Sequence, residues 1–68
     1  MNKVQSSNIA EVDYSAESQE LFIKFTNGAT YKYEEVPPRV YSDFLKAESK
    51  GKFFHSNIRN VYDYRRVE

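Results

Sequence analysis

The side chains that could do chemistry are concentrated in the C-terminal third of this 68-residue chain. Residues 46–66 carry six Lys or Arg against two Asp or Glu, whereas residues 1–45 carry four against seven. Cationic side chains can contact phosphates, and tyrosine rings can stack on nucleobases. The predicted nucleic-acid or anion-binding residues are Ser49, Lys50, Lys52, His55, Asn57, Arg59, Tyr62, Tyr64, Arg65 and Arg66.

Parts of this cluster also have a purely structural interpretation. Arg59 could lay its aliphatic stem over a sheet and pair with Glu48 or Asp63. Phe53 and Phe54 are more typical of a core than of a stacking platform. A locally basic segment of this kind is also common on a solvated surface. The sequence leaves these alternatives open.

No combination of residues predicts catalysis. Glu34 and Glu35 are adjacent, but successive strand residues point to opposite faces, so the two carboxylates cannot share one substrate bond. His55 is the only histidine and lacks the second His or clustered carboxylates that a metal site needs. Ser49 and Ser56 lie near His55 in the sequence, but no third group completes a triad. We therefore expect a chain that is not an enzyme and has no cofactor and no metal.

Length and composition limit the class of protein further. We expect one domain spanning residues 1–68, with residues 1–5 flexible. So small a chain needs an efficient core, for which six Tyr and five Phe supply large side chains. The absence of Cys favours the cytoplasm, and no apolar run is long enough to span a membrane. A net charge of zero argues against a strongly basic polyanion binder.

Period-two alternation of apolar and polar residues predicts three strands. They span residues 9–14, 21–25 and 29–33. In the first strand the alternation places Ala10, Val12 and Tyr14 on one face and acidic residues on the other. Such a strand is half buried.

The connection between the last two strands decides which side chains share a face. A two-residue loop, Asn27 and Gly28, would mix apolar and polar residues on both faces. A three-residue loop, with Gly28 in the left-handed conformation, sets Ile23 opposite Tyr31 and makes one face wholly apolar. We therefore predict the three-residue loop. The other face then presents a second candidate platform, formed by Phe22, Lys24 and Lys32.

Two helical segments should follow the strands. Pro38 suits the first turn of a helix over Pro38–Ser49, with Gly51 as its C-terminal stop. The apolar stripe of this helix consists of Val40, Tyr41, Phe44 and Leu45. Apolar residues then recur at roughly helical spacing between residues 53 and 62, which predicts a second, shorter helix. Residues 64–67 form either a closing strand or an irregular tail.

An ordered series of residues runs through nearly the whole chain, from about residue 4 to residue 66. Its members are Ser6, Ser7, Ile9, Val12, Tyr14, Leu21, Ile23, Phe25, Gly28, Tyr31, Tyr33, Val36, Pro37, Val40, Tyr41, Ala47, Ser49, Lys50, Gly51, Phe53, Phe54, Ile58, Arg59 and Tyr62. The series resembles the KTSC domain, a small module named for its occurrence at the C-terminus of some lysyl-tRNA synthetases. The family also occurs as free-standing short bacterial and phage proteins. Through its attachment to synthetases, the resemblance implies nucleic-acid binding.

Together these observations predict an α+β domain. It consists of a three-stranded antiparallel meander with one face covered by a helix and a shorter second helical segment. The function we expect is that of a non-catalytic binding module for nucleic acid, with RNA as the first candidate. Two alternatives stay open: a protein-interaction or self-associating module, which the aromatic content favours, and a binder of small anionic ligands or nucleotides.

Overall fold

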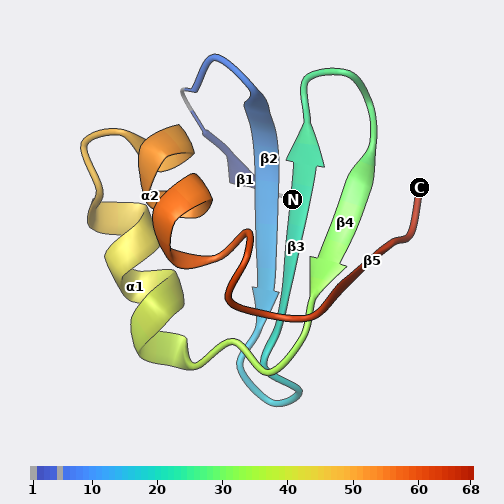
Figure 1. Cartoon of the computed structure of the whole chain (residues 1–68), viewed down its shortest axis with the longest axis vertical. Helices are drawn as coiled ribbons and strands as arrows, with labels where there is room; N and C mark the ends of the chain where they lie inside the picture. Colours follow the sequence, from blue (N-terminus) through green and yellow to red (C-terminus); the bar gives the residue numbers. More distant parts are fainter. Residues whose placement is uncertain (1, 5) are drawn as a thin grey trace.

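The computed structural model describes residues 2–4 and 6–68. Within these residues the elements follow in the order β1 (Asn2–Lys3), β2 (Ile9–Ser15), β3 (Glu20–Phe25), β4 (Thr30–Tyr33), α1 (Pro38–Lys46), α2 (Lys50–Asn57) and β5 (Tyr64–Arg66). The strands form one antiparallel sheet in the order β1-β2-β3-β4-β5, and both helices lie on the same side of it (Figure 1). The predicted α+β class is confirmed.

The sheet has more strands than the three predicted, because a short strand is added at each edge. β1 has two residues and β5 has three, which is too few for an alternating pattern to be recognised. β5 also settles the conformation of the tail, since it pairs with β4 and sets Tyr64 opposite Tyr33. The closing strand is therefore the correct alternative.

The N-terminal segment was expected to be flexible over residues 1–5. In the structure Asn2 pairs with Val12, and the Val4 amide donates to the carbonyl of Ala10 at 3.1 Å. Met1 and Gln5 lie outside the described residues, so the expectation for them is not addressed.

The predicted register of the β3–β4 hairpin is confirmed. Ile23 lies opposite Tyr31, and the amide of Phe25 donates to the carbonyl of Ala29 at 2.9 Å across the three-residue loop. Gly28 has a φ of +94°, a conformation that costs a side chain-bearing residue steric strain. The loop thus places the apolar side chains of both strands on one face.

β2 differs from the regular strand that was predicted, because it contains a bulge at Ala10. The register with β3 shifts between Ile9 and Glu11, so β2 has one residue more than its partner there. As a result Ile9 and Val12 are both fully buried, and Ile9 takes the inward position predicted for Ala10.

The helix boundaries differ from those predicted. α1 begins at Pro38 as expected but ends before Ala47, whose backbone is extended. Ser49 then caps α2, because its Oγ accepts a hydrogen bond from the amide of Lys52 at 3.3 Å. Gly51 therefore lies in the first turn of α2, and its assignment as the C-terminal stop of α1 is wrong. Neither helix in the described part of the chain is long and apolar enough to cross a membrane.

The core lies between the sheet and the two helices. Its buried members are Ile9, Val12, Leu21, Ile23, Tyr33, Val36, Phe44, Phe54 and Ile58. Phe54 fixes α2 to the sheet, since its ring lies edge-on to Phe25 and to Tyr33 with 5.4 Å between centroids in both pairs. Leu45 departs from the predicted apolar stripe of α1, because 44% of its surface is exposed.

Phe44→Ala should lower the free energy of unfolding by about 3–5 kcal/mol, because it removes a fully buried ring and leaves a cavity. Leu45→Ala, at the next position of the same helix, should cost about 1 kcal/mol or less because Leu45 is half exposed. Urea denaturation measures both values. Equal losses for the two variants would contradict the packing of α1 described above.

Candidate nucleic-acid interface

A groove of about 350 Å³ opens beside α2, over the face of the sheet formed by β3, β4 and β5. Its volume lies at the lower end of the roughly 300–1,000 Å³ typical of small-molecule sites. Five rings line it, those of Phe25, Tyr31, Tyr33, Phe54 and Tyr64. Its polar lining consists of Asn8, Asn27, His55, Arg59 and Asn60, and Ala29 and Gly51 complete it. We call this cavity the aromatic groove.

The strand register brings the tyrosines of the groove together. Tyr64 on β5 lies opposite Tyr33 on β4, and its ring centroid is 5.4 Å from that of Tyr33 and 5.6 Å from that of Tyr31. Tyr33 is buried and Tyr31 is half-buried, whereas 55% of Tyr64 is exposed. In Figure 1, β4 and β5 form the edge of the sheet that lies farthest from the helices. The outer part of the tyrosine row is therefore accessible to a ligand.

Arg59 and His55 form the cationic part of the rim. Nη1 of Arg59 lies 3.3 Å from Nδ1 of His55, a contact in which the guanidinium donates and an unprotonated imidazole nitrogen accepts. The ion pair found among residues 2–4 and 6–68 joins Lys32 to Glu20. Arg59 therefore does not form the ion pair with Glu48 or Asp63 that the sequence left open. Both side chains are exposed and can turn toward an anion.

Five of the predicted binding residues lie at or beside the groove. His55, Arg59 and Tyr64 line it. Lys52 and Ser49, the N-cap of α2, line an adjoining hollow that shares Asn8, Gly51 and His55 with the groove. Two others close helix ends: Nζ of Lys50 donates to the carbonyl of Ala47 at 3.1 Å, and Nδ2 of Asn57 donates to that of Phe53 at 3.2 Å.

The remaining predicted residues have other surroundings. Tyr62 is half-buried against the core. Arg65 lies opposite Lys32, on the sheet face that points away from the helices. Nε of Arg66 donates to the carbonyl of Glu68 at 2.8 Å. The structure thus does not gather all ten predicted residues into one site.

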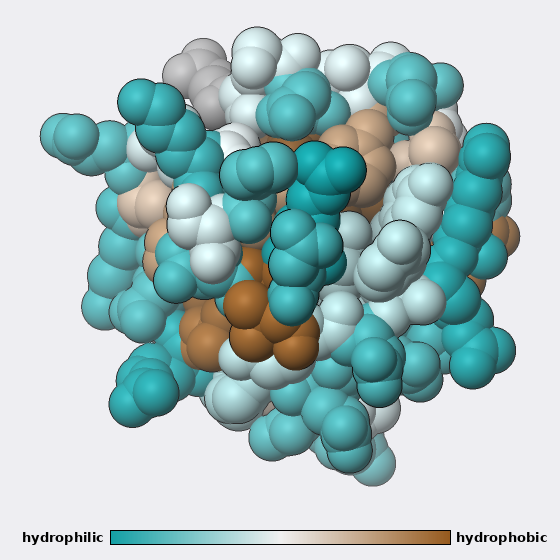
Figure 2. All heavy atoms as spheres, in the orientation of Figure 1, coloured by the Kyte–Doolittle hydropathy of each residue, from teal (hydrophilic) through white to brown (hydrophobic). Residues whose placement is uncertain are grey.

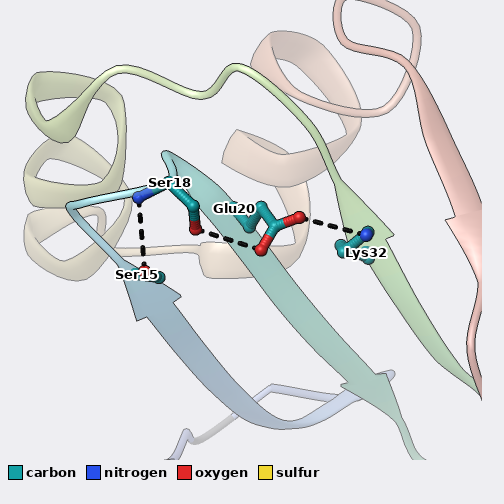
Figure 3. Close-up of polar contacts among 4 residues, drawn as sticks. All are labelled: Ser15, Ser18, Glu20 and Lys32. Atoms are coloured by element: carbon teal, nitrogen blue, oxygen red, sulfur yellow. Dashed lines mark hydrogen bonds and ion pairs between the residues drawn. The ribbon is translucent and has the colours of Figure 1, made fainter.

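The outer sheet face, the second candidate platform, is occupied by internal contacts. Figure 3 shows Glu20 between Ser18 and Lys32, with 3.0 Å between Oε2 and Nζ of Lys32 and 3.0 Å between Oε1 and Oγ of Ser18. The hydrogen bonds from Lys32 and from Ser18 hold the pKa of Glu20 below its usual value. Lys32 is therefore engaged, and Phe22 opposite it is only half exposed.

The side-chain amides that line the groove were not among the residues predicted from the sequence. Asn8 comes from the segment before β2, and a Cβ at Gly51 would lie only 3.1 Å from its Oδ1. Asn27 belongs to the β3–β4 loop and Asn60 to the segment after α2. Only the glycine in an otherwise helical segment was a signal, since it indicates close approach by another part of the chain. The described part of the chain contains no group of three or more His, Asp or Glu that could hold a metal ion.

The fold and the groove define a small α+β domain with an aromatic cavity bordered by amide and cationic groups. The model of the KTSC domain matches residues 5–64. The chain therefore belongs to the KTSC domain family, as the pattern of its residues indicated.

Related proteins fall into two groups. A protein of Tsukamurella paurometabola is 46% identical over 59 residues, which cover 87% of this chain and 88% of that protein. The crystal structure of a KTSC domain protein from Yersinia pestis superposes with a TM-score of 0.93 at 35% identity, covering 98% of this chain and 94% of that one. A lysine–tRNA ligase of Nostoc punctiforme is 34% identical over 65 residues, which cover 96% of this chain but only 12% of the ligase.

Burial raises the pKa of Tyr33 to about 12, and the neighbouring Tyr64 contributes to the rise. The folded state therefore holds this proton more tightly than the unfolded chain, in which the pKa of tyrosine is about 10. The resulting contribution to stability is complete below about pH 10 and is lost as the pH rises towards 12. A titration of tyrosine absorbance should show a late step near pH 12 that Tyr33→Phe removes. Persistence of this step in the variant would contradict the burial of the Tyr33 hydroxyl.

Proposed function

We propose that the chain is a non-catalytic module that binds single-stranded nucleic acid, with RNA as the first candidate, through the aromatic groove. The observation that carries the proposal is the presence of accessible tyrosine rings, Arg59, His55 and side-chain amides around one cavity of about 350 Å³. These groups can stack on the face of a base, contact a phosphate and form hydrogen bonds with the edge of a base.

Stacking would supply most of the affinity for a base. A base stacked on an aromatic side chain contributes about 1–3 kcal/mol, whichever base it is. Tyr64 offers the largest exposed ring surface of the groove, and its neighbours Tyr31 and Tyr33 hold it in the tyrosine row. A duplex does not expose the faces of its bases, so the groove suits a single strand.

The cationic groups suit a small number of phosphates. Arg59 is on the rim of the groove, and Lys52 lines the adjoining hollow, where Glu48 is the carboxylate present. Because the whole chain has no net charge, long-range attraction contributes little. We therefore expect modest affinity and a shallow dependence on salt, as for one or two phosphate contacts.

The relatives agree with this proposal. The Nostoc punctiforme protein is named a lysine–tRNA ligase, and a region of it that is about as long as this chain is similar in sequence to this chain. A second such ligase, from Trichormus variabilis, is also 34% identical over 65 residues. We carry the RNA context of that ligase over to this chain, in which the groove described above would supply the contacts.

Self-association is the competing function. It is favoured by the exposure of Val61, at 60%, and of Tyr64, at 55%. However, Figure 2 shows hydrophilic side chains over most of the visible face, with only small apolar areas between them. This face therefore offers little apolar surface for a second copy of the chain. Sedimentation at several concentrations, with and without RNA, distinguishes the two functions.

Tyr64→Ala should weaken the binding of a short single-stranded RNA by about 1–3 kcal/mol, because one stacking surface is lost. Tyr64→Phe keeps the ring and should bind within about threefold of the unchanged chain. Fluorescence anisotropy at low salt gives the affinities, and an NMR spectrum of each variant establishes that it is folded. Unchanged binding by a folded Tyr64→Ala variant would exclude the groove as the site.

Arg59→Gln should weaken binding and reduce the slope of log affinity against log salt concentration by about one, since one phosphate contact is removed. Arg39→Gln, which removes an exposed charge of α1 that does not line the groove, should leave the slope unchanged. Equal slopes for the two variants would show that Arg59 does not contact phosphate.

A further inference from the structure

We infer that the binding of single-stranded nucleic acid to the aromatic groove is coupled to the uptake of a proton by His55, an inference that rests on the proposed function. It is based on the contact of 3.3 Å between Nη1 of Arg59 and Nδ1 of His55. Both side chains line the groove. The affinity of the groove for RNA should therefore rise as the pH falls.

The contact between the two side chains requires that Nδ1 of His55 carries no proton. A guanidinium has only donors, so the imidazole nitrogen must accept the hydrogen bond. A protonated imidazole has donors on both nitrogens and no acceptor left. Protonation of His55 therefore breaks its contact with Arg59 and places two positive charges side by side on the rim of the groove.

A phosphate at the rim would reverse the balance between the two forms of His55. Its oxygens can accept from a guanidinium and from an imidazolium at the same time, and hydrogen bonds between charged groups are stronger than those between neutral ones. In the free chain the neighbouring charge of Arg59 opposes the same proton. Because linkage is reciprocal, a phosphate that favours the proton is itself bound more tightly when the proton is present.

The position of His55 suits this role. Its side chain lines both the aromatic groove and the adjoining hollow, so it lies where the two cavities meet. His55 and Arg59 are both exposed, and they can turn toward a phosphate without disturbing the core.

The other charged groups around His55 do not produce the coupling. Lys52 of α2 and Glu48, which precedes α2, line the hollow with it, and neither forms an ion pair with it among residues 2–4 and 6–68. Ammonium and carboxylate groups ordinarily keep their charge between about pH 5.5 and pH 8. They therefore act on the imidazole in the same way at both ends of this range.

The remaining elements packed around His55 contribute no charge in this range. β4 and β5 contribute tyrosines to the groove, and phenols ordinarily titrate near pH 10. The segment before β2 contributes only serine and asparagine side chains. His55 is the only histidine of the chain, and histidine is the side chain that ordinarily changes charge between about pH 5 and pH 8.

The test measures the affinity of the chain for a single-stranded uridine hexanucleotide at pH 8 and at pH 5.5 by fluorescence anisotropy. Uracil keeps its charge over this range, so a change in affinity reports on the protein. We expect about tenfold tighter binding at pH 5.5, as one additional charged hydrogen bond allows. The slope of log affinity against log salt concentration should also become steeper by about one, because a further phosphate charge is neutralised.

His55→Gln is the decisive variant. The amide oxygen of glutamine can still accept a hydrogen bond from Arg59, but the amide does not titrate. The variant should bind the hexanucleotide equally well at both pH values. Calorimetry in two buffers of different ionisation enthalpy should detect proton uptake by the unchanged chain and none by the variant. Arg39→Gln keeps His55 and should retain the pH dependence.

The outcomes separate this inference from the proposed function. Equal affinity of the unchanged chain at the two pH values, or the same pH dependence in a folded His55→Gln variant, would overturn the coupling and leave single-strand binding intact. No binding at either pH at low salt would overturn the proposed function together with the coupling.

Discussion

The packing of one ring, that of Phe54, holds the layers of this domain together. It lies edge-on to Phe25 of β3 and to Tyr33 of β4, and it fixes α2 to the sheet. Phe54 covers Tyr33, which is buried, but leaves Tyr31 half-buried and Tyr64 mostly accessible. The same contact that completes the core therefore sets where the core ends and the aromatic groove begins. A groove built in this way needs no separate scaffold.

A close approach at the start of α2 positions the amide side of the groove. A glycine within a helix costs up to about 1 kcal/mol relative to alanine. Here Gly51 lets the segment before β2 lie against α2, with Oδ1 of Asn8 at 3.1 Å and Oγ of Ser6 at 3.4 Å from where a Cβ would be. The cost in helix stability is thus linked to the placement of a side chain that borders the proposed site.

The β3–β4 hairpin shows what a sequence of this length can predict. Its register follows from the pattern, because a shift of one residue would move Ile23 and Tyr31 to the wrong face. Boundaries were less predictable: Ser49 can end one helix or cap the next, and its side-chain contact with Lys52 decides for the cap. β5 has too few residues to show a period.

The candidate site was predicted only in part for a related reason. Arg59 and Tyr64 have residue types that indicate binding, so composition was enough to select them. Asn8 lies 43 positions before Gly51 along the chain. The glycine indicates that some part of the chain approaches α2, but nothing local identifies that part as Asn8. Such contacts depend on the path of the whole chain, which periodicity does not determine. For Arg65, periodicity corrects the choice made from residue type, because strand alternation places its side chain on the face opposite that of its neighbour Tyr64.

The most direct test of this account is to map the amide chemical shifts of the protein during titration with a short single-stranded RNA at low salt. We predict that the shifts concentrate around the groove, at Asn8, Tyr31, His55, Arg59 and Tyr64, and saturate at one binding site. Shifts centred on Phe22 of the outer sheet face, or no shifts at all, would contradict the central claim that the aromatic groove binds nucleic acid.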